Sequence, residues 1–411
     1  MAQCIEGCRS CNSADLEVVL RLGNQFLSGV FRSENVEGIS CGPLTLVSCN
    51  QCKLVQLQNS YPLDEMYNEG YGYRSGLTAF MREHLLGIIS FAKNIVELQS
   101  GDSVLDIGSN DGTLLNCYND RMIDLIGIDP VAVNYLNLYP KNAKIVSDFF
   151  TKENYFSVSS SKSKIVTSVS MFYDLNDPVG FAKSIADVLS PDGVWVFEQS
   201  YLPAMLRLNS YDTICHEHVE YYSLFSIQKI LDQADLIIID ASQNDVNGGS
   251  VRLAAAHATS RLASRISPEL MWLNNQEKNH DVFSTETFEL FEKNLVRHKN
   301  DLTDLLLTLK KSGKSVVGYG ASTKGNVILQ YCGIGPDLLP CIGDITPFKD
   351  GTFTPGTLIP IISMDKAKAI KPDYFLVLPW AFRNDILTRE KECLANGTKF
   401  IFPLPFVEIV N

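Results

Sequence analysis

Residues 103–115 read SVLDIGSNDGTLL, and this stretch decides the fold of the middle of the chain. The apolar residues at its start have the length of a buried strand, and a glycine-containing turn and a helix start follow them. Further strand patterns occur at residues 124–128, 164–169 and 193–198, the last after a turn at residues 190–193. Because strands and helices alternate, we expect a doubly wound parallel sheet.

The turn in this stretch also predicts a cofactor. Its pattern, Asp-x-Gly-x-Asn-Asp-Gly, lacks the GxGxxG spacing that seats a diphosphate on a helix N-terminus. Polar Asn and Asp side chains favour a cationic ligand without phosphate, and we predict S-adenosylmethionine. Acidic side chains after the next two strands are expected to meet the ribose hydroxyls and adenine. The predicted cofactor residues are Asp106, Gly108, Asn110, Asp111, Asp129 (ribose), and Asp148 and Phe149 (adenine).

Four cysteines near the N-terminus form two Cys-x-x-Cys pairs, Cys8 with Cys11 and Cys49 with Cys52. Each pair can wrap two thiolates around one cation, and two pairs complete a tetrahedral zinc site. Four thiolates leave zinc no open position, so we predict a structural metal in a zinc-binding ribbon. Cys4 and Cys41 are alternative ligands, but we expect them to be free thiols.

A glycine and tyrosine loop, GYGYRSG at residues 70–76, precedes a helical pattern at residues 77–98. Glycine allows close backbone approach and phenol rings both stack and donate hydrogen bonds, so Tyr71 and Tyr73 are candidates for ligand binding. The alternative is an ordinary loop packed by aromatic rings.

Near the C-terminus, residues 314–326 read KSVVGYGASTKGN, again a strand, a glycine-rich turn and a helix start. This turn carries hydroxyls and Lys324 at a helix N-terminus, which suits a phosphate or diphosphate. Strand patterns follow at residues 338–343, ending in Asp344, and at residues 374–378, ending in Pro379 and Trp380. We expect a second Rossmann-like domain that binds a phosphorylated substrate; the alternative is a domain kept for oligomerisation.

The length and composition fit three domains of a globular protein. We expect a zinc-binding domain at residues 1–68, a cofactor-binding domain with an inserted catalytic segment at residues 69–285, and a linking helix with the second Rossmann-like domain at residues 286–411. The net charge of −12 argues against nucleic acid as a partner. No apolar run long enough for a membrane span and no signal pattern appear, so we expect a cytoplasmic monomer or dimer.

Residues 212–222, DTICHEHVEYY, suggest three kinds of site: a metal site, a proton-transfer site or a polar surface loop. The four clustered thiolates provide a better metal site than His216 and His218. The position just beyond the strand ending at Glu198 puts the segment where the cofactor sheet should face its substrate. We therefore favour proton transfer, with His218 as the base.

Taken together, the motifs along nearly the whole chain resemble the sugar-nucleotide C-methyltransferases, which place a methyl branch on C3 of 4-keto deoxysugars bound for antibiotics and surface polysaccharides. The motifs that carry the resemblance are the paired Cys-x-x-Cys, Tyr71-x-Tyr73, Met81-Arg82-Glu83-His84, Asn110-Asp111-Gly112, Asp148-Phe149-Phe150, Glu217-His218, Gly248-Gly249-x-Val251-Arg252, Val317 to Ala321 and Cys332 to Asp337.

The resemblance implies roles for individual residues. His218, supported by Glu217, would remove the proton alpha to the ketone, Tyr73 would stabilise the enolate, and the enolate would take the methyl group of S-adenosylmethionine. The nucleotide-linked sugar would lie against Tyr71, Tyr73, Arg252, Ser322, Lys324 and Trp380, with Lys324 near the diphosphate and Trp380 near the sugar or base.

Four positions depart from the family pattern: Cys215 replaces a tyrosine, Ser170 an asparagine, and Asp174 and Asn247 each replace a histidine. A thiol donates a weaker hydrogen bond than a phenol. These changes keep two alternatives open, namely O-methylation or another S-adenosylmethionine-dependent reaction on a related nucleotide sugar, and a binding protein without catalytic activity.

Overall fold

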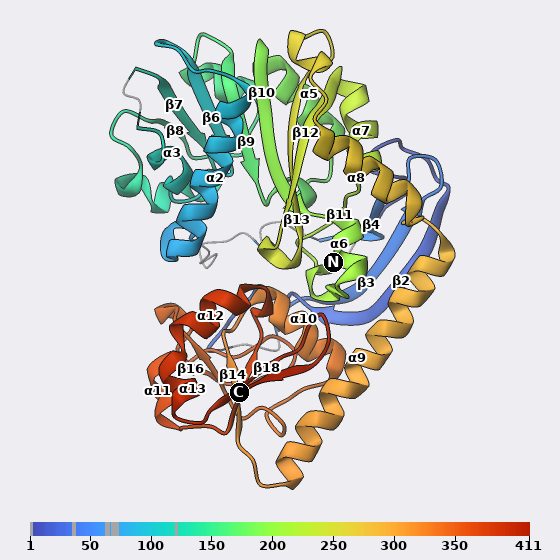
Figure 1. Cartoon of the computed structure of the whole chain (residues 1–411), viewed down its shortest axis with the longest axis vertical. Coiled ribbons are helices and arrows are strands. Elements are labelled where there is room, and N and C mark those ends of the chain that lie inside the picture. Colours follow the sequence, from blue (N-terminus) through green and yellow to red (C-terminus); the bar gives the residue numbers. More distant parts are fainter. Residues whose placement is uncertain (1–2, 35–37, 62–65, 67–73, 120–121) are drawn as a thin grey trace.

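The structure is a computed structural model that describes residues 3–34, 38–61, 66, 74–119 and 122–411. Figure 1 shows a large sheet at the top, a smaller one at the bottom, and a long curved β-hairpin beside them, with one long helix running down the same side. None of the helices in the described part of the chain combines the length and apolar character of a membrane span.

Seven strands form the upper sheet in the order β12-β13-β10-β9-β6-β7-β8. The neighbours from β10 to β8 pair in parallel, and β13 is antiparallel to both of its neighbours. The predicted doubly wound sheet is therefore confirmed. Its strands are β6 (Ser103–Ile107), β7 (Asp124–Ile128), β8 (Lys144–Val146), β9 (Ser163–Val169), β10 (Leu189–Ser200), β12 (Leu236–Asn244) and β13 (Ser250–His257).

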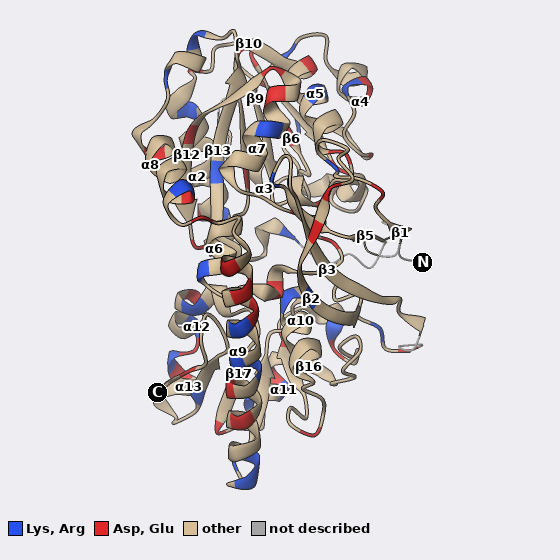
Figure 2. Ribbon diagram, turned by 90° about the vertical axis from the view of Figure 1, so that its right-hand side faces the viewer, with Lys and Arg blue, Asp and Glu red and all other residues tan. Residues whose placement is uncertain are grey.

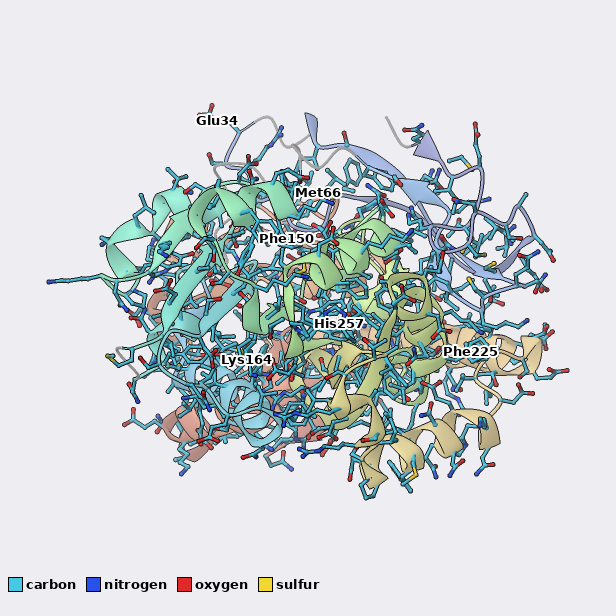
Figure 3. The ribbon with its side chains drawn as sticks, turned by 90° about the horizontal axis from the view of Figure 1, so that it is seen from above. Glu34, Met66, Phe150, Lys164, Phe225 and His257 are labelled. Atoms are coloured by element: carbon cyan, nitrogen blue, oxygen red, sulfur yellow. The ribbon has the colours of Figure 1, made fainter. Side chains whose placement is uncertain are left out.

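Seven helices accompany this sheet: α2 (Ala79–Ile95), α3 (Thr113–Asn116), α4 (Lys152–Val158), α5 (Pro178–Val188), α6 (Leu202–Arg207), α7 (Leu224–Leu231) and α8 (Pro268–Asn279). The carboxyl ends of the parallel strands face the smaller sheet (Figure 1). Figure 3 looks onto the opposite end of the sheet and labels Lys164, the second residue of β9, and His257, the last residue of the antiparallel β13. The predicted turn at residues 190–193 instead lies inside β10, whose pairing with β9 shifts register between Leu189 and Val194.

The N-terminal part is a four-stranded antiparallel sheet in the order β11-β4-β3-β2. Its strands are β2 (Leu16–Phe26), β3 (Cys41–Cys49), β4 (Val55–Leu57) and β11 (Glu220–Tyr221), and β1 (Gln3–Cys4) pairs separately with β5 (Asn59–Ser60). The last strand of this sheet comes from far along the chain, directly after the Glu-His pair of the catalytic segment. The zinc-binding part and the catalytic segment therefore share one sheet.

The C-terminal sheet has six strands in the order β16-β15-β14-β17-β18-β19 and is parallel except for β19. Its strands are β14 (Val316–Tyr319), β15 (Ile342–Asp344), β16 (Ile361–Ser363), β17 (Tyr374–Val377), β18 (Lys399–Phe402) and β19 (Glu408–Val410), and its helices are α10 (Thr323–Cys332), α11 (Met364–Ala369), α12 (Arg383–Arg389) and α13 (Lys391–Ala395). β15 begins later than predicted because Pro340 has no N–H to give to a strand ladder.

The linking helix α9 (Thr285–Lys311) is present where the sequence pattern predicts it. Its buried residues recur every three or four positions, which is the period of one helix face: Phe288, Phe291, Leu295, His298, Leu302, Leu306 and Leu309. Acidic and basic residues both recur along the length of this helix (Figure 2). The apolar face joins the largest hydrophobic core, which also holds the C-terminal sheet, so the helix ties the parts together.

Candidate active site

The sulfur atoms of the four predicted zinc ligands lie close together. The Sγ atoms of Cys8, Cys11, Cys49 and Cys52 are all within 4.8 Å of one another, with 3.4 Å between Cys8 and Cys52 and 3.5 Å between Cys11 and Cys49. Zn–S bonds of about 2.3 Å in a tetrahedron require S···S separations of roughly 3.8 Å. The four thiols therefore fit one zinc ion, which supplies a fixed cross-link and no open position for chemistry.

A buried glutamine connects this metal site to the catalytic segment. The Nε2 atom of Gln56 donates to Cys8 Sγ at 3.2 Å, and its Oε1 accepts from the backbone N–H of Arg9 at 3.0 Å. Gln56 lies on β4 and faces Glu220 of β11, and the next residue, Leu57, donates its N–H to the Val219 carbonyl at 2.8 Å. Strand β4 therefore carries Gln56, which donates to a zinc-ligating sulfur, and it also pairs with the residues just after His218.

The cofactor loop lies between β6 and α3, where Gly108, Asn110 and Gly112 all have positive φ. Both oxygens of the Asp129 carboxylate accept backbone N–H groups, from Asn110 at 2.9 Å and from Val131 at 2.7 Å. This contact joins the loop after β6 to the end of β7. Asp129 therefore lies just after β7 beside the cofactor loop, and its contact with the ribose hydroxyls stays a prediction.

Asp106, in β6 beneath the loop, is buried, and its Oδ1 accepts the hydroxyl of Thr167 at 2.6 Å. Burial raises the pKa of Asp106 to about 7, against the lowering effect of that hydrogen bond. Next to it, the side chains of Asn110 and Asp111 accept the N–H groups of Ser75 at 3.0 Å and Gly76 at 3.1 Å. The segment that leads into α2 is therefore held against the cofactor loop.

Tyr71 and Tyr73 lie outside the described residues, so their predicted roles stay predictions. Asp148 and Phe149 follow β8 on the same edge of the sheet, and the Phe149 ring is 57% exposed. An exposed ring at this edge fits adenine stacking. The acids and the glycine turn thus fit S-adenosylmethionine, which supplies the methyl group when bound.

Residues 211–222, the segment that carries the predicted base, are buried except at His218. Of the twelve residues 211–222, all of which the structure describes, only His218 is half-buried and the others are buried. The Nδ1–H of His218 donates to the carbonyl of Thr213 at 2.8 Å. Because a carbonyl can only accept, this bond places the proton on Nδ1 and leaves the Nε2 lone pair free to take one.

The environment of His218 keeps its ring neutral. Burial, and then the charge of Lys324, lower its pKa to about 3, while the bond to the Thr213 carbonyl acts in the opposite direction. The Tyr173 ring lies against it, with centroids 4.2 Å apart. Lys324 lies at the start of α10 in the C-terminal part, so a predicted substrate residue from another domain contributes to the electrostatic environment of the predicted base.

The other predicted residues of the C-terminal turn have well-defined contacts. Ser322 caps α10 by accepting the N–H of Gly325 at 3.0 Å, and the Lys324 ammonium donates to the Asn247 carbonyl at 2.7 Å. Trp380 is buried, and its Nε1–H donates to Asp212 at 2.7 Å. These bonds fasten the C-terminal domain to the catalytic segment and to the Gly248-Gly249 turn. The predicted contacts with substrate stay predictions.

Comparison with protein families accounts for all three parts of the chain. The model described as "Putative zinc binding domain" matches residues 8–67, the "Methyltransferase domain" model matches residues 77–241, and the "C-methyltransferase C-terminal domain" model matches residues 245–405. The chain is therefore a zinc-binding, S-adenosylmethionine-dependent methyltransferase whose C-terminal part matches the C-methyltransferase model.

The C-methyltransferase is similar over its length to a curated protein, C-methyltransferase NovU of Streptomyces niveus. The two are 28% identical over 411 residues, which cover 99% of this chain and 97% of NovU. Among solved structures, the N-methyltransferase NodS from Bradyrhizobium japonicum with S-adenosyl-L-homocysteine is 13% identical with a TM-score of 0.34, covering 46% of this chain and 93% of that one. The mitomycin 7-O-methyltransferase MmcR is 14% identical, also at 0.34, covering 42% and 53%. Similarity this distant carries no inference about chemistry.

Glu217 of the C-methyltransferase does not supply the bond that orients His218, since the Thr213 carbonyl accepts the Nδ1 proton. Its buried carboxyl accepts hydrogen bonds from the Gly29 backbone and the Cys215 thiol, and burial raises its pKa. Glu217 therefore links the catalytic segment to the N-terminal sheet. A direct catalytic role for Glu217 stays a prediction.

Arg252, a predicted substrate residue, is engaged inside the methyltransferase domain. Its Nε donates to Glu198 Oε2 at 2.9 Å, and Asn244 donates to the same oxygen at 2.9 Å. His84 of α2 bonds the other oxygen. With Glu198 only 1% exposed, Arg252 compensates a buried carboxylate.

Sequence reasoning missed Thr213, Gln56 and the buried pair of Glu198 and Arg252. Thr213 acts through its backbone carbonyl, which leaves no side-chain signal. Gln56 lies four residues after Cys52 in an apolar strand, KLVQL, where a lone amide among apolar residues is the one available sign. His84 belongs to the motif Met81-Arg82-Glu83-His84, but sequence spacing does not reveal its partner, Glu198.

Proposed function

We propose that this C-methyltransferase adds the methyl group of S-adenosylmethionine to C3 of a nucleotide-linked 4-keto deoxysugar, with His218 as the general base. The observation that carries the proposal is the tautomer of His218, whose Nδ1 proton is held by a backbone carbonyl while Nε2 is bare. A neutral imidazole with a fixed ring is suited to take a proton from carbon next to a ketone.

The chemistry requires a base because carbon alpha to a ketone is no nucleophile until it loses its proton. Removal of that proton gives an enolate, whose carbon attacks the electrophilic methyl group of the cofactor. The ring of His218 is positioned for this step by the Thr213 carbonyl and by the ring of Tyr173. Its depressed pKa keeps it unprotonated at neutral pH.

The C-terminal sheet supports a nucleotide-linked substrate. The ammonium of Lys349 donates to the carbonyl of Ala321 at 2.6 Å, in the turn between β14 and α10. Asp344, at the end of β15, accepts the N–H of Ala321 at 2.7 Å and holds the turn in place. An ammonium group beside a helix N-terminus forms a suitable environment for a diphosphate.

The test is methyl transfer from labelled S-adenosylmethionine to a panel of 4-keto-6-deoxy sugar nucleotides, with the product analysed by NMR. We expect a new carbon-bound methyl group at C3, no transfer to matched sugar nucleotides with a 4-hydroxyl, and no transfer by His218→Ala. An ether product would support O-methylation instead, and transfer to the 4-hydroxyl sugars would contradict the enolate mechanism.

A further inference from the structure

The ammonium of Lys324 lies at the junction between the cofactor loop, the catalytic segment and the C-terminal domain. It donates to the Asn247 carbonyl at 2.7 Å, and the Asn247 amide donates to the Ser170 hydroxyl at 3.3 Å. Ser170 follows β9, and the next side chain, Met171, lies 3.4 Å from where a Cβ on Gly108 of the cofactor loop would be. Asn247 therefore connects the Lys324 ammonium to Ser170, which follows β9 at the edge of the sheet that carries the cofactor loop.

The charge of Lys324 is felt by the groups on the catalytic segment. Lys324 lowers the pKa of His218, while burial lowers the pKa of Lys324 itself and the Asp212 carboxylate acts in the opposite direction. The Asp212 carboxylate also accepts the Trp380 indole N–H at 2.7 Å. Asp212 is therefore shared between Lys324 and Trp380, so the positive charge of Lys324 can also act on a bound ligand. Charges act strongly where water is excluded.

Proton removal by His218 requires a second group that stabilises the product anion. A histidine whose pKa is far below its ordinary value is a weak proton acceptor, so the anion it creates has to be stabilised as it forms. Cys215 follows Thr213 closely on the segment, but a thiol is a weak hydrogen-bond donor. Lys324 offers a strong donor here, because its helix α10 packs against Tyr211–Thr213, and the Thr213 carbonyl holds the His218 ring.

We propose that Lys324 is a catalytic residue whose ammonium stabilises the enolate oxygen that forms when His218 removes the proton. The inference rests on the proposed function. The C–H electron pair becomes the C=C bond, and the carbonyl π electrons move to oxygen, where Lys324 donates a hydrogen bond. The C=C electrons then form the bond to the methyl carbon, and the C–S pair returns to sulfur, giving S-adenosylhomocysteine. The proton on His218 passes to solvent.

Lys349 offers a matched comparison on the same turn. Its ammonium bonds the Ala321 carbonyl at 2.6 Å and lies 4.4 Å from the centre of the Phe31 ring, and the charge of Asp344 acts on it. His218 is not among the groups whose charges act on it. Lys349 is therefore placed to bind a phosphate without contributing to the proton-transfer step.

The experiment compares Lys324→Met with Lys349→Met in the full-length, zinc-loaded enzyme, using the 4-keto sugar nucleotide that the wild type methylates best. We measure deuterium uptake at C3 with S-adenosylhomocysteine bound, kcat and KM for methyl transfer, and the Kd for S-adenosylmethionine. Lys324→Met should lower kcat and the exchange rate by about 10²–10³-fold with KM changed less than about threefold. Lys349→Met should mainly raise KM.

A rise in KM for Lys324→Met with kcat and exchange intact would overturn the inference and make Lys324 a diphosphate ligand. Lys324→Arg keeps the charge and should retain more exchange than Lys324→Met, and equal losses in both variants would contradict a role for the charge. An unchanged Kd for S-adenosylmethionine shows that a variant is folded. A wild type that exchanges no deuterium with any 4-keto sugar nucleotide would refute the proposed function itself, whereas exchange that is normal in both wild type and Lys324→Met refutes the inference alone.

Discussion

Gln56 should connect zinc binding to the position of the catalytic base. Its side chain is fully buried, donates to Cys8 Sγ at 3.2 Å, and accepts from the Arg9 backbone at 3.0 Å. Through β4 it pairs with Glu220 of β11, two residues after His218. A change at Gln56 therefore acts on the metal site and on the catalytic segment together.

Gln56→Leu removes a hydrogen bond to a thiolate and leaves the Arg9 N–H without its acceptor. Loss of such a bond to a metal ligand lowers metal affinity by about 10–100-fold, and an unpaired buried N–H costs about 1–3 kcal/mol. We expect a zinc affinity 10–100-fold weaker. Faster amide exchange is expected across residues 211–222, because the metal-linked edge of β4 no longer holds β11 firmly.

The assay titrates zinc out with a chelator and follows amide hydrogen exchange by mass spectrometry. Cys49→Ser serves as the metal-poor reference, and Gln58→Leu, two residues along from Gln56 and only half-buried, as the matched control. The Kd for S-adenosylmethionine should be unchanged in Gln56→Leu, since the cofactor loop belongs to a different sheet. Wild-type zinc affinity and wild-type exchange at residues 211–222 would refute the connection.

Two further predictions concern stability. Arg252→Met should lower the free energy of unfolding by about 3 kcal/mol, because it leaves the buried Glu198 carboxylate without its cation; urea unfolding checks this, and a wild-type midpoint with a raised substrate KM would instead make Arg252 a substrate ligand. Burial lowers the pKa of His216 to about 4, so the folded state binds fewer protons than the unfolded state between about pH 4 and 6.5 and stability falls as the pH drops through that range. Between pH 7 and 5 the wild type should lose about 2 kcal/mol relative to His216→Gln, and a pH-independent difference would contradict the buried neutral ring.

Local patterns along the chain predict much of this fold. The strand and glycine turn at residues 103–112, the linking helix and the strand-turn-helix near residue 320 all lie where the sequence places them. Strand ends set by non-local pairing were predicted less well, as in β10 and β15. The two-residue strand β11 could not be predicted, because its partner β4 lies more than 160 positions earlier and the pairing has no local signature.

Site residues with a local sequence signal were likewise predicted better than contacts between distant parts of the chain. The zinc cysteines were found because their chemistry depends on residue type and spacing, and they converge as predicted. The Thr213 carbonyl and the bond between Trp380 and Asp212 depend on how separate elements meet in space. Glu217 illustrates the limit, since its position next to His218 suggested support for the ring, while its carboxyl faces Gly29 in the turn after β2.

The central claim, that His218 removes a proton from carbon next to a ketone, is tested most directly by deuterium exchange without methyl transfer. The enzyme, S-adenosylhomocysteine and a 4-keto-6-deoxy sugar nucleotide are incubated in heavy water, and uptake at C3 is followed by NMR. We predict uptake by the wild type and none above background by His218→Ala, with equal Kd for S-adenosylmethionine in the two proteins. Uptake that persists at the wild-type rate in His218→Ala would contradict the claim.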